Sequence, residues 1–162
     1  MILVTVGMQL GFDRLIEALD ELAPTLEVPV FAQIGKGTYK ARNMETATSI
    51  SPVEFDKLLE RTTLIVAHAG IGTVLTAQRH RKPILLFPRR AALGEHRNDH
   101  QLATVKELQG RSGIIVAMDV PDLPEAIGKG LAMDMSELPV YPQRDKLRSA
   151  IENFILGGDL KS

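Results

Sequence analysis

The chain has 162 residues, of which 44% are hydrophobic, enough for one domain with a sizeable core. Its 19 Lys and Arg residues against 20 Asp and Glu residues give a formal net charge of −1, which argues against a nucleic-acid binder because such proteins carry a basic excess. Cysteine is absent, which excludes disulfides and thiolate metal sites and fits a reducing cytosol. The first apolar run has no basic segment before it, and no apolar stretch reaches about 20 residues, so we expect neither a signal peptide nor a membrane span.

Short β-branched runs alternate with segments of helical period, a rhythm typical of a parallel sheet with crossover helices. Ser51 and Pro52, for example, supply an N-cap and a first-turn proline for one of these helices. We predict strands over residues 2–6, 28–34, 45–50, 63–67, 83–87 and 113–117. We predict helices over about 12–22, 52–60, about 71–80, about 97–109 and 121–131, and a last helix over about 142–157.

These elements predict a single α/β domain over residues 1–162, with a Rossmann-like parallel sheet flanked by helices. In such sheets ligands collect outside the carboxyl ends of the strands. Three predicted loops lie there, namely residues 7–11, 68–73 and 89–101. Candidate binding residues are therefore expected in these three loops.

The second loop carries the glycines of His68-Ala69-Gly70-Ile71-Gly72-Thr73 just before a predicted helix. Glycines let backbone amides approach a ligand closely, and the amino end of the helix favours a phosphate. Gly70, Gly72 and the Thr73 hydroxyl are candidate donors, and His68 either donates to a phosphate or bonds a neighbouring loop. Glycine turns also join strands to helices without any ligand, and Leu75 replaces the third glycine of a dinucleotide fingerprint, so NAD fits poorly.

The third loop begins with Arg89 and Arg90 directly after a buried strand, where a guanidinium suits a diphosphate or a carboxylate. Glu95, Asp99 and Gln101 are candidates for sugar hydroxyls, although a polar loop without a ligand has the same composition.

His96 and His100 are four residues apart at a predicted helix start, a spacing that suits a metal ion. No third ligand is evident, and a solvated helix face explains the pair equally. We predict no protein-bound metal and no cofactor.

Three stretches of this chain resemble the donor-binding half of family 28 glycosyltransferases of the GT-B type. They are residues 68–73, residues 81–88, and Glu95-His96 followed by residues 98–103. Residues 4–7 and 12–15 resemble the start of that half. The resemblance spans most of residues 1–110 in the order of the family.

A complete GT-B enzyme has two Rossmann-like domains, so the resemblance implies the soluble donor subunit of a split enzyme. One group of such enzymes adds N-acetylglucosamine to a dolichol-linked sugar in eukaryotes. The other, which this sequence resembles more closely, builds bacterial exopolysaccharides and includes glucuronosyltransferases. The expected function is inverting transfer from a UDP-sugar to a polyprenyl-diphosphate-linked acceptor. The expected location is the cytoplasm, at the inner face of the membrane through a membrane-associated partner subunit.

Residue by residue, the resemblance implies that Gly70, Gly72 and Thr73 hold the UDP diphosphate, with His68 and Gly7 beside it. It also implies that Glu95, Asp99 and Gln101 face the ribose or the donor sugar, and it assigns no general base, which is expected on the partner.

The sequence departs from the family at Met8 and Gln9, where relatives often carry small hydroxyl residues. It departs again at Thr76, where many relatives carry a ribose-binding acid, so the ribose partner is unassigned.

Arg89 and Arg90 favour UDP-glucuronate as the donor, since a guanidinium fork suits its carboxylate. The last predicted helix, with Leu147, Ile151 and Phe154 on one stripe, either docks the partner or closes the core of this domain. The alternative function is a non-catalytic nucleotide-binding regulatory module.

Overall fold

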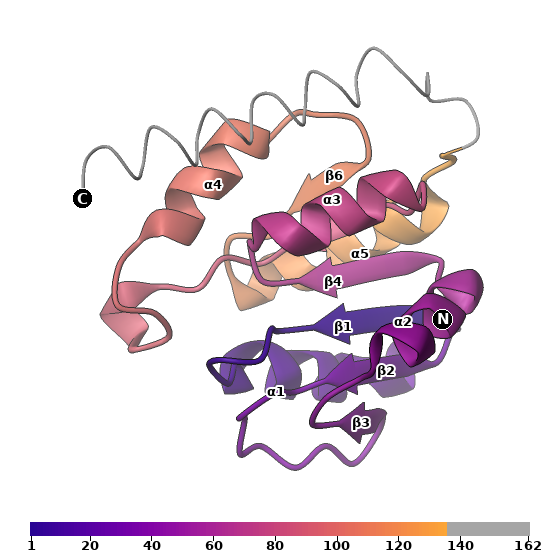
Figure 1. Cartoon of the computed structure of the whole chain (residues 1–162), viewed down its shortest axis with the longest axis horizontal. Helices are drawn as coiled ribbons and strands as arrows, with labels where there is room; N and C mark the ends of the chain where they lie inside the picture. Colours follow the sequence, from indigo (N-terminus) through magenta and orange to yellow (C-terminus); the bar gives the residue numbers. More distant parts are fainter. Residues whose placement is uncertain (136–162) are drawn as a thin grey trace.

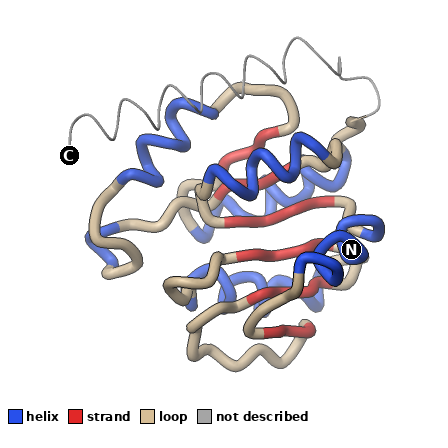
Figure 2. The backbone as a smooth tube through the Cα atoms, in the orientation of Figure 1, coloured by secondary structure: helices blue, strands red, loops and turns tan. Residues whose placement is uncertain are grey.

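A computed structural model of the chain describes residues 1–135. It contains a six-stranded parallel sheet with strand order β3-β2-β1-β4-β5-β6 (Figures 1 and 2). The strands are β1 (Ile2–Thr5), β2 (Val30–Gln33), β3 (Glu45–Ala47), β4 (Leu64–Ala67), β5 (Ile84–Leu86) and β6 (Ile114–Val116). The α-helices are α1 (Asp13–Leu22), α2 (Pro52–Arg61), α3 (Ile71–Arg79), α4 (His100–Leu108) and α5 (Leu123–Ala132). The predicted Rossmann-like fold class is confirmed, whereas the predicted helix over about 142–157 lies outside the described residues.

The two central strands, β1 and β4, are apolar along their length because both faces of the sheet are covered. Ile2 and Val4 of β1 pack into one core with α1 and α5, whereas Leu3 packs into a second core with α2, α3 and α4. These two groups of helices lie on opposite sides of the sheet (Figure 1). Among residues 1–135, no helix is long and apolar enough to cross a membrane.

The predicted elements and the structure differ most between β5 and β6. The helix predicted over about 97–109 begins only at His100. Before it, Ala91–Leu93 forms a 3₁₀ turn, Gly94 takes a left-handed backbone (φ 71°), and the Asp99 carboxylate accepts from the amide of Ala91 at 3.0 Å. Asp99 therefore holds its own loop together, which delays the helix.

The direction of chain progression through the sheet reverses beside β1. From β1 the chain moves outward to β2 and β3, then returns to β4 on the other side of β1 and continues to β5 and β6. In parallel sheets this switch point opens a crevice at the carboxyl ends of the strands, where ligands bind. The loops after β1, β4 and β5 lie together at this edge, as predicted.

Two carboxylates of α1 hold the long loop between β2 and β3. Asp13 accepts from the amide and hydroxyl of Thr38 at 3.0 and 2.7 Å and from the amide of Tyr39 at 3.1 Å. Asp20, only 2% exposed, accepts from the hydroxyl of Tyr39 and from the amides of residues 42–43 at 2.7–3.1 Å. The loop is ordered by this helix rather than by secondary structure of its own.

Replacing Asp20 with Asn is expected to lower the free energy of unfolding by about 2 kcal/mol at pH 7, because charge-assisted hydrogen bonds are lost. Burial alone would raise the pKa of Asp20, but the hydrogen bonds that it accepts outweigh this effect and lower the pKa below its ordinary value. Its stabilising contribution is therefore present above about pH 4 and is lost as the pH falls through the lowered pKa. Urea unfolding from pH 3 to 7 should give a difference from wild type that narrows in acid. Glu21→Gln, at an exposed position of the same helix, is the control, and a pH-independent difference would contradict this account.

Candidate functional site

The loop after β1 begins at Gly7, whose φ of +80° favours glycine. A buried side chain of β2 holds this loop: Oε1 of Gln33 accepts from the Thr5 hydroxyl at 2.9 Å and the Val6 amide at 3.2 Å. Its Nε2 donates to the carbonyls of Gly7 at 3.1 Å and Thr48 at 3.0 Å. Gln33 was not among the predicted site residues. Its only sequence signal is a single polar side chain within the otherwise apolar run of residues 30–34.

The His68 ring, at the end of β4, lies between two glycines. A Cβ added at Gly7 would lie 3.2 Å from Nε2 of His68, and one at Gly70 would lie 2.4 Å from Cε1. Only glycine fits at Gly70 without moving the ring. Burial, together with the positive charge of Arg89 and the nearby His96, lowers the pKa of His68 to about 4. His68 is therefore neutral at physiological pH.

The Gln101 amide joins the loops after β4 and β5. Its Oε1 lies 3.3 Å from the Ala69 amide and 2.9 Å from the Arg89 amide, both of which donate to it. Its Nε2 lies 3.0 Å from Nδ1 of His68. Gln101 is 7% exposed, so the structure directs this predicted sugar-binding side chain into the protein and toward His68.

The amino end of α3 carries uncapped backbone amides. Gly70 is the N-cap residue of α3 and has no side chain to cap the helix. The first hydrogen bond of the helix is the one that the Val74 amide donates to the Gly70 carbonyl at 3.3 Å. No residue between 1 and 135 accepts from the amides of residues 71–73. Gly72 is exposed, and a Cβ there would meet nothing within 4 Å. Free amides at the positive end of a helix dipole suit an anion, so this geometry is compatible with the phosphate contacts predicted for Gly70, Gly72 and Thr73, which stay predictions.

Arg89, a predicted ligand for diphosphate or carboxylate, instead donates to backbone carbonyls. Nη1 donates to Gly11 at 2.6 Å and to Glu95 at 3.4 Å, and Nη2 donates to Leu10 at 3.2 Å and through a short bond to Val6. The side chain is only 2% exposed. Both terminal nitrogens of the guanidinium therefore hold the loop after β1 in place.

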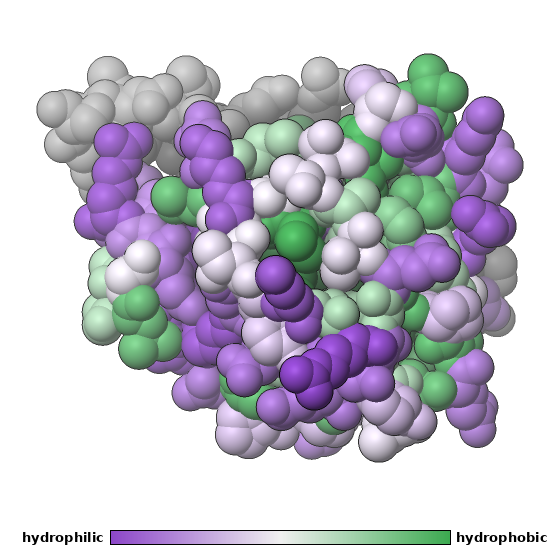
Figure 3. Space-filling model, turned by 90° about the horizontal axis from the view of Figure 1, so that it is seen from below, coloured by the Kyte–Doolittle hydropathy of each residue, from purple (hydrophilic) through white to green (hydrophobic). Residues whose placement is uncertain are grey.

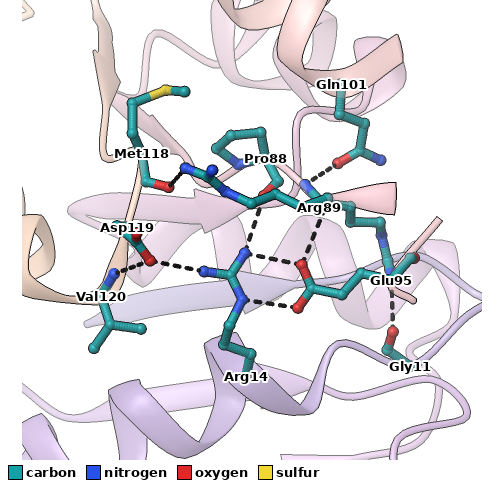
Figure 4. Close-up of polar contacts among 10 residues, drawn as sticks. Gly11, Arg14, Pro88, Arg89, Glu95, Gln101, Met118, Asp119 and Val120 are labelled. Carbon is teal, nitrogen blue, oxygen red and sulfur yellow. Dashed lines mark hydrogen bonds and ion pairs between the residues drawn. The ribbon is translucent and has the colours of Figure 1, made fainter. Parts of the chain in front are cut away.

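Glu95, predicted to face ribose or sugar, pairs with Arg14 of α1 (Figure 4). Its two carboxylate oxygens lie 2.8 Å from Nε and Nη2 of Arg14, and one of them accepts from the Arg90 amide at 3.1 Å. Arg14 also reaches Asp119 at 3.2 Å. Nη2 of Arg90 donates to the Met118 carbonyl at 2.8 Å, whereas its buried Nε has no partner. Arg14 was not among the predicted site residues, and no local pattern marks it.

The predicted site residues thus fall into two groups. In the first group, Gly7 and Gly70 lie against the His68 ring, Gln101 bonds its Nδ1, and Gly72 and Thr73 lie in the first turn of α3 that follows. In the second group, the side chains lie in the loop after β5 and bond to other groups of the protein. They are Arg89, Arg90, Glu95 and Asp99. The ligand contacts of both groups stay predictions.

His96 lies before α4 rather than on it, and its Nδ1 accepts from the Asn98 amide at 3.4 Å. Among residues 1–135, no three His, Cys, Asp or Glu side chains could together hold a metal ion. What the first group of site residues offers is neutral N–H donors, namely the free amides of α3 and the neutral His68 ring beside them.

The family described as the glycosyltransferase family 28 C-terminal domain matches residues 1–153. A UDP-N-acetylglucosamine transferase subunit ALG13 from Cryptococcus neoformans var. neoformans serotype D is 27% identical over 95 residues, covering 57% of this chain and 45% of that protein. The chain thus spans about half the length of the curated relatives that it matches.

Solved structures share the fold. The solution structure of ALG13 superposes with a TM-score of 0.61 at 15% identity, covering 95% of this chain and 96% of that chain. The spinosyn forosaminyltransferase SpnP superposes with a TM-score of 0.59 at 17% identity, covering 93% of this chain and 39% of that chain. The match over residues 1–153 places this chain in the glycosyltransferase family 28 C-terminal domain family.

Proposed function

We propose that this chain is the UDP-sugar-binding subunit of a two-component inverting glycosyltransferase. The observation that carries the proposal is the uncapped amino end of α3, which lies beside the neutral His68 ring at the switch point of the sheet. Membership of family 28 supports it, as does similarity to a protein named as a UDP-N-acetylglucosamine transferase subunit. A diphosphate fits this place because amide donors and a helix dipole converge on it.

In the proposed reaction, an acceptor hydroxyl oxygen attacks the anomeric carbon of the donor sugar from the face opposite UDP. The bond from that carbon to the phosphate oxygen breaks, and UDP leaves with the electron pair. The hydroxyl proton passes to a base that we place on the partner subunit. The amides of residues 71–73 stabilise the charge that builds on the leaving diphosphate, because they are oriented before the reaction begins.

Exposed apolar side chains near the proposed site support a partner subunit. Met8, Leu10 and Leu93 are 55%, 45% and 57% exposed in the loops after β1 and β5. The strands point to the left in Figure 1, and Figure 3, turned about the horizontal axis, shows hydrophobic residues among the polar ones on its left side. We propose that a membrane-associated partner covers this edge and brings a polyprenyl-diphosphate-linked acceptor. The pair would work at the inner face of the membrane, in exopolysaccharide synthesis.

For the donor sugar we propose glucuronate, with Arg90 as the residue that senses its carboxylate. The Arg89 guanidinium is committed to backbone carbonyls, whereas the Arg90 side chain donates only from Nη2, to the Met118 carbonyl, and its Nη1 has no partner among the described residues. The measurement is the ratio of the affinities for UDP-glucuronate and UDP-glucose. An equal ratio in the wild-type and Arg90→Ala chains would contradict the choice of sugar but not the binding of UDP.

The proposed function is tested by calorimetric titration of the chain with UDP, UDP-sugars, NAD and ATP. The wild-type chain is expected to select uridine nucleotides, and Gly72→Asp to bind UDP at least tenfold more weakly. The added carboxylate has room, since nothing lies within 4 Å of a Cβ there, but it repels the diphosphate. Because an acidic side chain in the first turn favours a helix, the melting temperature should be unchanged or higher.

The matched control is Gly128→Asp in α5, where a Cβ is equally unobstructed and which lies in a different helix. Preference for NAD or ATP, or equal UDP affinity in the wild-type and Gly72→Asp chains, would contradict the proposal. Sugar transfer that appears only when the partner is added would separate the catalytic subunit from a non-catalytic regulatory module.

A further inference from the structure

We propose that Gln101 is a positioning residue for His68. Its side-chain amide holds the His68 ring in the tautomer that carries hydrogen on Nε2. The ring then presents an N–H donor to the anion bound at the amino end of α3. The inference rests on the proposed function for the identity of that anion. The tautomer itself rests on geometry alone.

The orientation of the Gln101 amide follows from its two backbone partners. The amides of Ala69 and Arg89 both donate toward the same side-chain atom, at 3.3 and 2.9 Å. Backbone N–H groups cannot accept, so this atom is the carbonyl oxygen and not the NH₂ group. The NH₂ group therefore points to the His68 ring.

The ring nitrogen that faces this NH₂ group acts as an acceptor. Nε2 of Gln101 lies 3.0 Å from Nδ1 of His68, and an amide nitrogen only donates. Nδ1 thus offers its lone pair, and in a neutral imidazole the hydrogen is on Nε2. Burial is the main factor that disfavours a positive charge on the ring, and the guanidinium of Arg89 and the imidazole of His96 disfavour it further.

The Nε2 atom of His68 is open to a ligand. It has no hydrogen-bond partner among residues 1–135, and the single side-chain nitrogen or oxygen there that is buried without a partner is Nε of Arg90. Nε2 is therefore accessible, on the side of the ring where Gly7 leaves room for close approach. The Nε2–H group of His68 therefore lies beside the free amides of α3 as a further donor. Because the ring is neutral, this donor adds no charge to the site.

A glutamate in place of Gln101 should reverse this arrangement. Its carboxylate would still accept from the two backbone amides, but it could only accept from the ring. His68 would then carry hydrogen on Nδ1, with a lone pair on Nε2 facing the diphosphate, or would become doubly protonated at lower pH. The affinity for UDP should fall at least tenfold at pH 8 and recover partly at pH 6. In the wild-type chain it should be nearly constant over this range.

The first experiment is a long-range ¹H–¹⁵N NMR spectrum of the full chain with ¹⁵N-labelled histidine at pH 7, without ligand. The signals of His68 are assigned with a His68→Asn chain, since the sequence has 4 histidines. Wild-type His68 is expected to show a protonated Nε2 and an unprotonated Nδ1, and Gln101→Glu a protonated Nδ1. A protonated Nδ1 in the wild-type chain overturns the inference, and this outcome does not depend on the folding of Gln101→Glu.

The second experiment titrates UDP and uridine against wild type, Gln101→Glu and the control Gln109→Glu from pH 6 to 8. Gln109 is exposed at the end of α4 and receives the same change of charge. A positioning role predicts a loss for UDP and not for uridine, whereas a general loss of stability weakens both. Equal UDP affinity in Gln101→Glu and wild type overturns the inference. If the wild-type chain shows no UDP binding, the proposed function and the donor role of His68 fail together, and the NMR result still decides the tautomer.

Discussion

Replacing Arg89 with lysine is expected to lower the free energy of unfolding by about 3 kcal/mol, although the charge is kept. The Arg89 guanidinium is 2% exposed and donates to the carbonyls of Val6, Leu10, Gly11 and Glu95. A lysine ammonium is a compact group and cannot reach carbonyls spread around a planar fork. Some of these buried carbonyls would be left without a donor, and the ammonium would be poorly solvated.

The measurement is urea unfolding of the wild-type and Arg89→Lys chains followed by circular dichroism. Arg79→Lys is the control, because Arg79 is exposed in the last turn of α3 and a lysine serves there equally well. Arg89 also lies 4.7 Å from the centre of the Phe12 ring, a contact that a lysine would weaken. If Arg89→Lys has the same free energy of unfolding as the wild type, then other contacts hold the loop after β1. The hydrogen bonds of Gln33 would be the first of these contacts to test.

Replacing Glu95 with Gln is expected to lower the free energy of unfolding by about 2 kcal/mol at low salt, because charge-assisted hydrogen bonds are lost. It is also expected to strengthen the binding of UDP. The Glu95 carboxylate pairs with both Nε and Nη2 of Arg14, and the two side chains are 11% and 20% exposed. It also favours the charged form of the buried Arg89, whose pKa is lowered mainly by burial. A glutamine places an NH₂ donor near the Arg14 guanidinium and leaves its charge poorly compensated.

The direction of the change in UDP affinity distinguishes two roles for Glu95. If it faces ribose or sugar, as the family resemblance implies, Glu95→Gln should weaken the binding of UDP or UDP-sugar. If it serves Arg14, as the structure has it, the removal of a negative charge from the loop after β5, at the same edge of the sheet as the proposed anion site, should tighten UDP binding. Calorimetric titration of both chains with UDP measures this difference, and weaker binding would restore the sugar-facing role.

The stability of Glu95→Gln is measured by urea unfolding at low and high salt. The difference from wild type should shrink as salt screens the charge of Arg14. Glu125→Gln is the control, because Glu125 is 80% exposed in its pair with Lys129, and such pairs contribute little. A loss in Glu95→Gln no larger than in this control would contradict a stabilising role for the Arg14 pair.

Part of the candidate site could be predicted because it depends on local sequence. The apolar runs of β1 and β4, the Ser51 N-cap of α2 and the glycines before α3 are each contained in a few neighbouring residues. Their alternation predicts a parallel sheet, and parallel strands end at the same edge. The loops of Gly7 and His68 could therefore be placed together before their contacts were known.

The sequence by itself thus determined the order and type of the elements and the edge of the sheet at which chemistry is expected, since hydrophobic period and turn residues act over short distances. Tertiary structure alone decided which polar side chains face that space. Arg89 bonds to Val6, 83 residues away, and Glu95 to Arg14, 81 residues away. A buried donor forms a hydrogen bond with an acceptor that the fold brings close, and this acceptor can be far away in the sequence. Local sequence patterns therefore do not predict which carbonyl or carboxylate it will be.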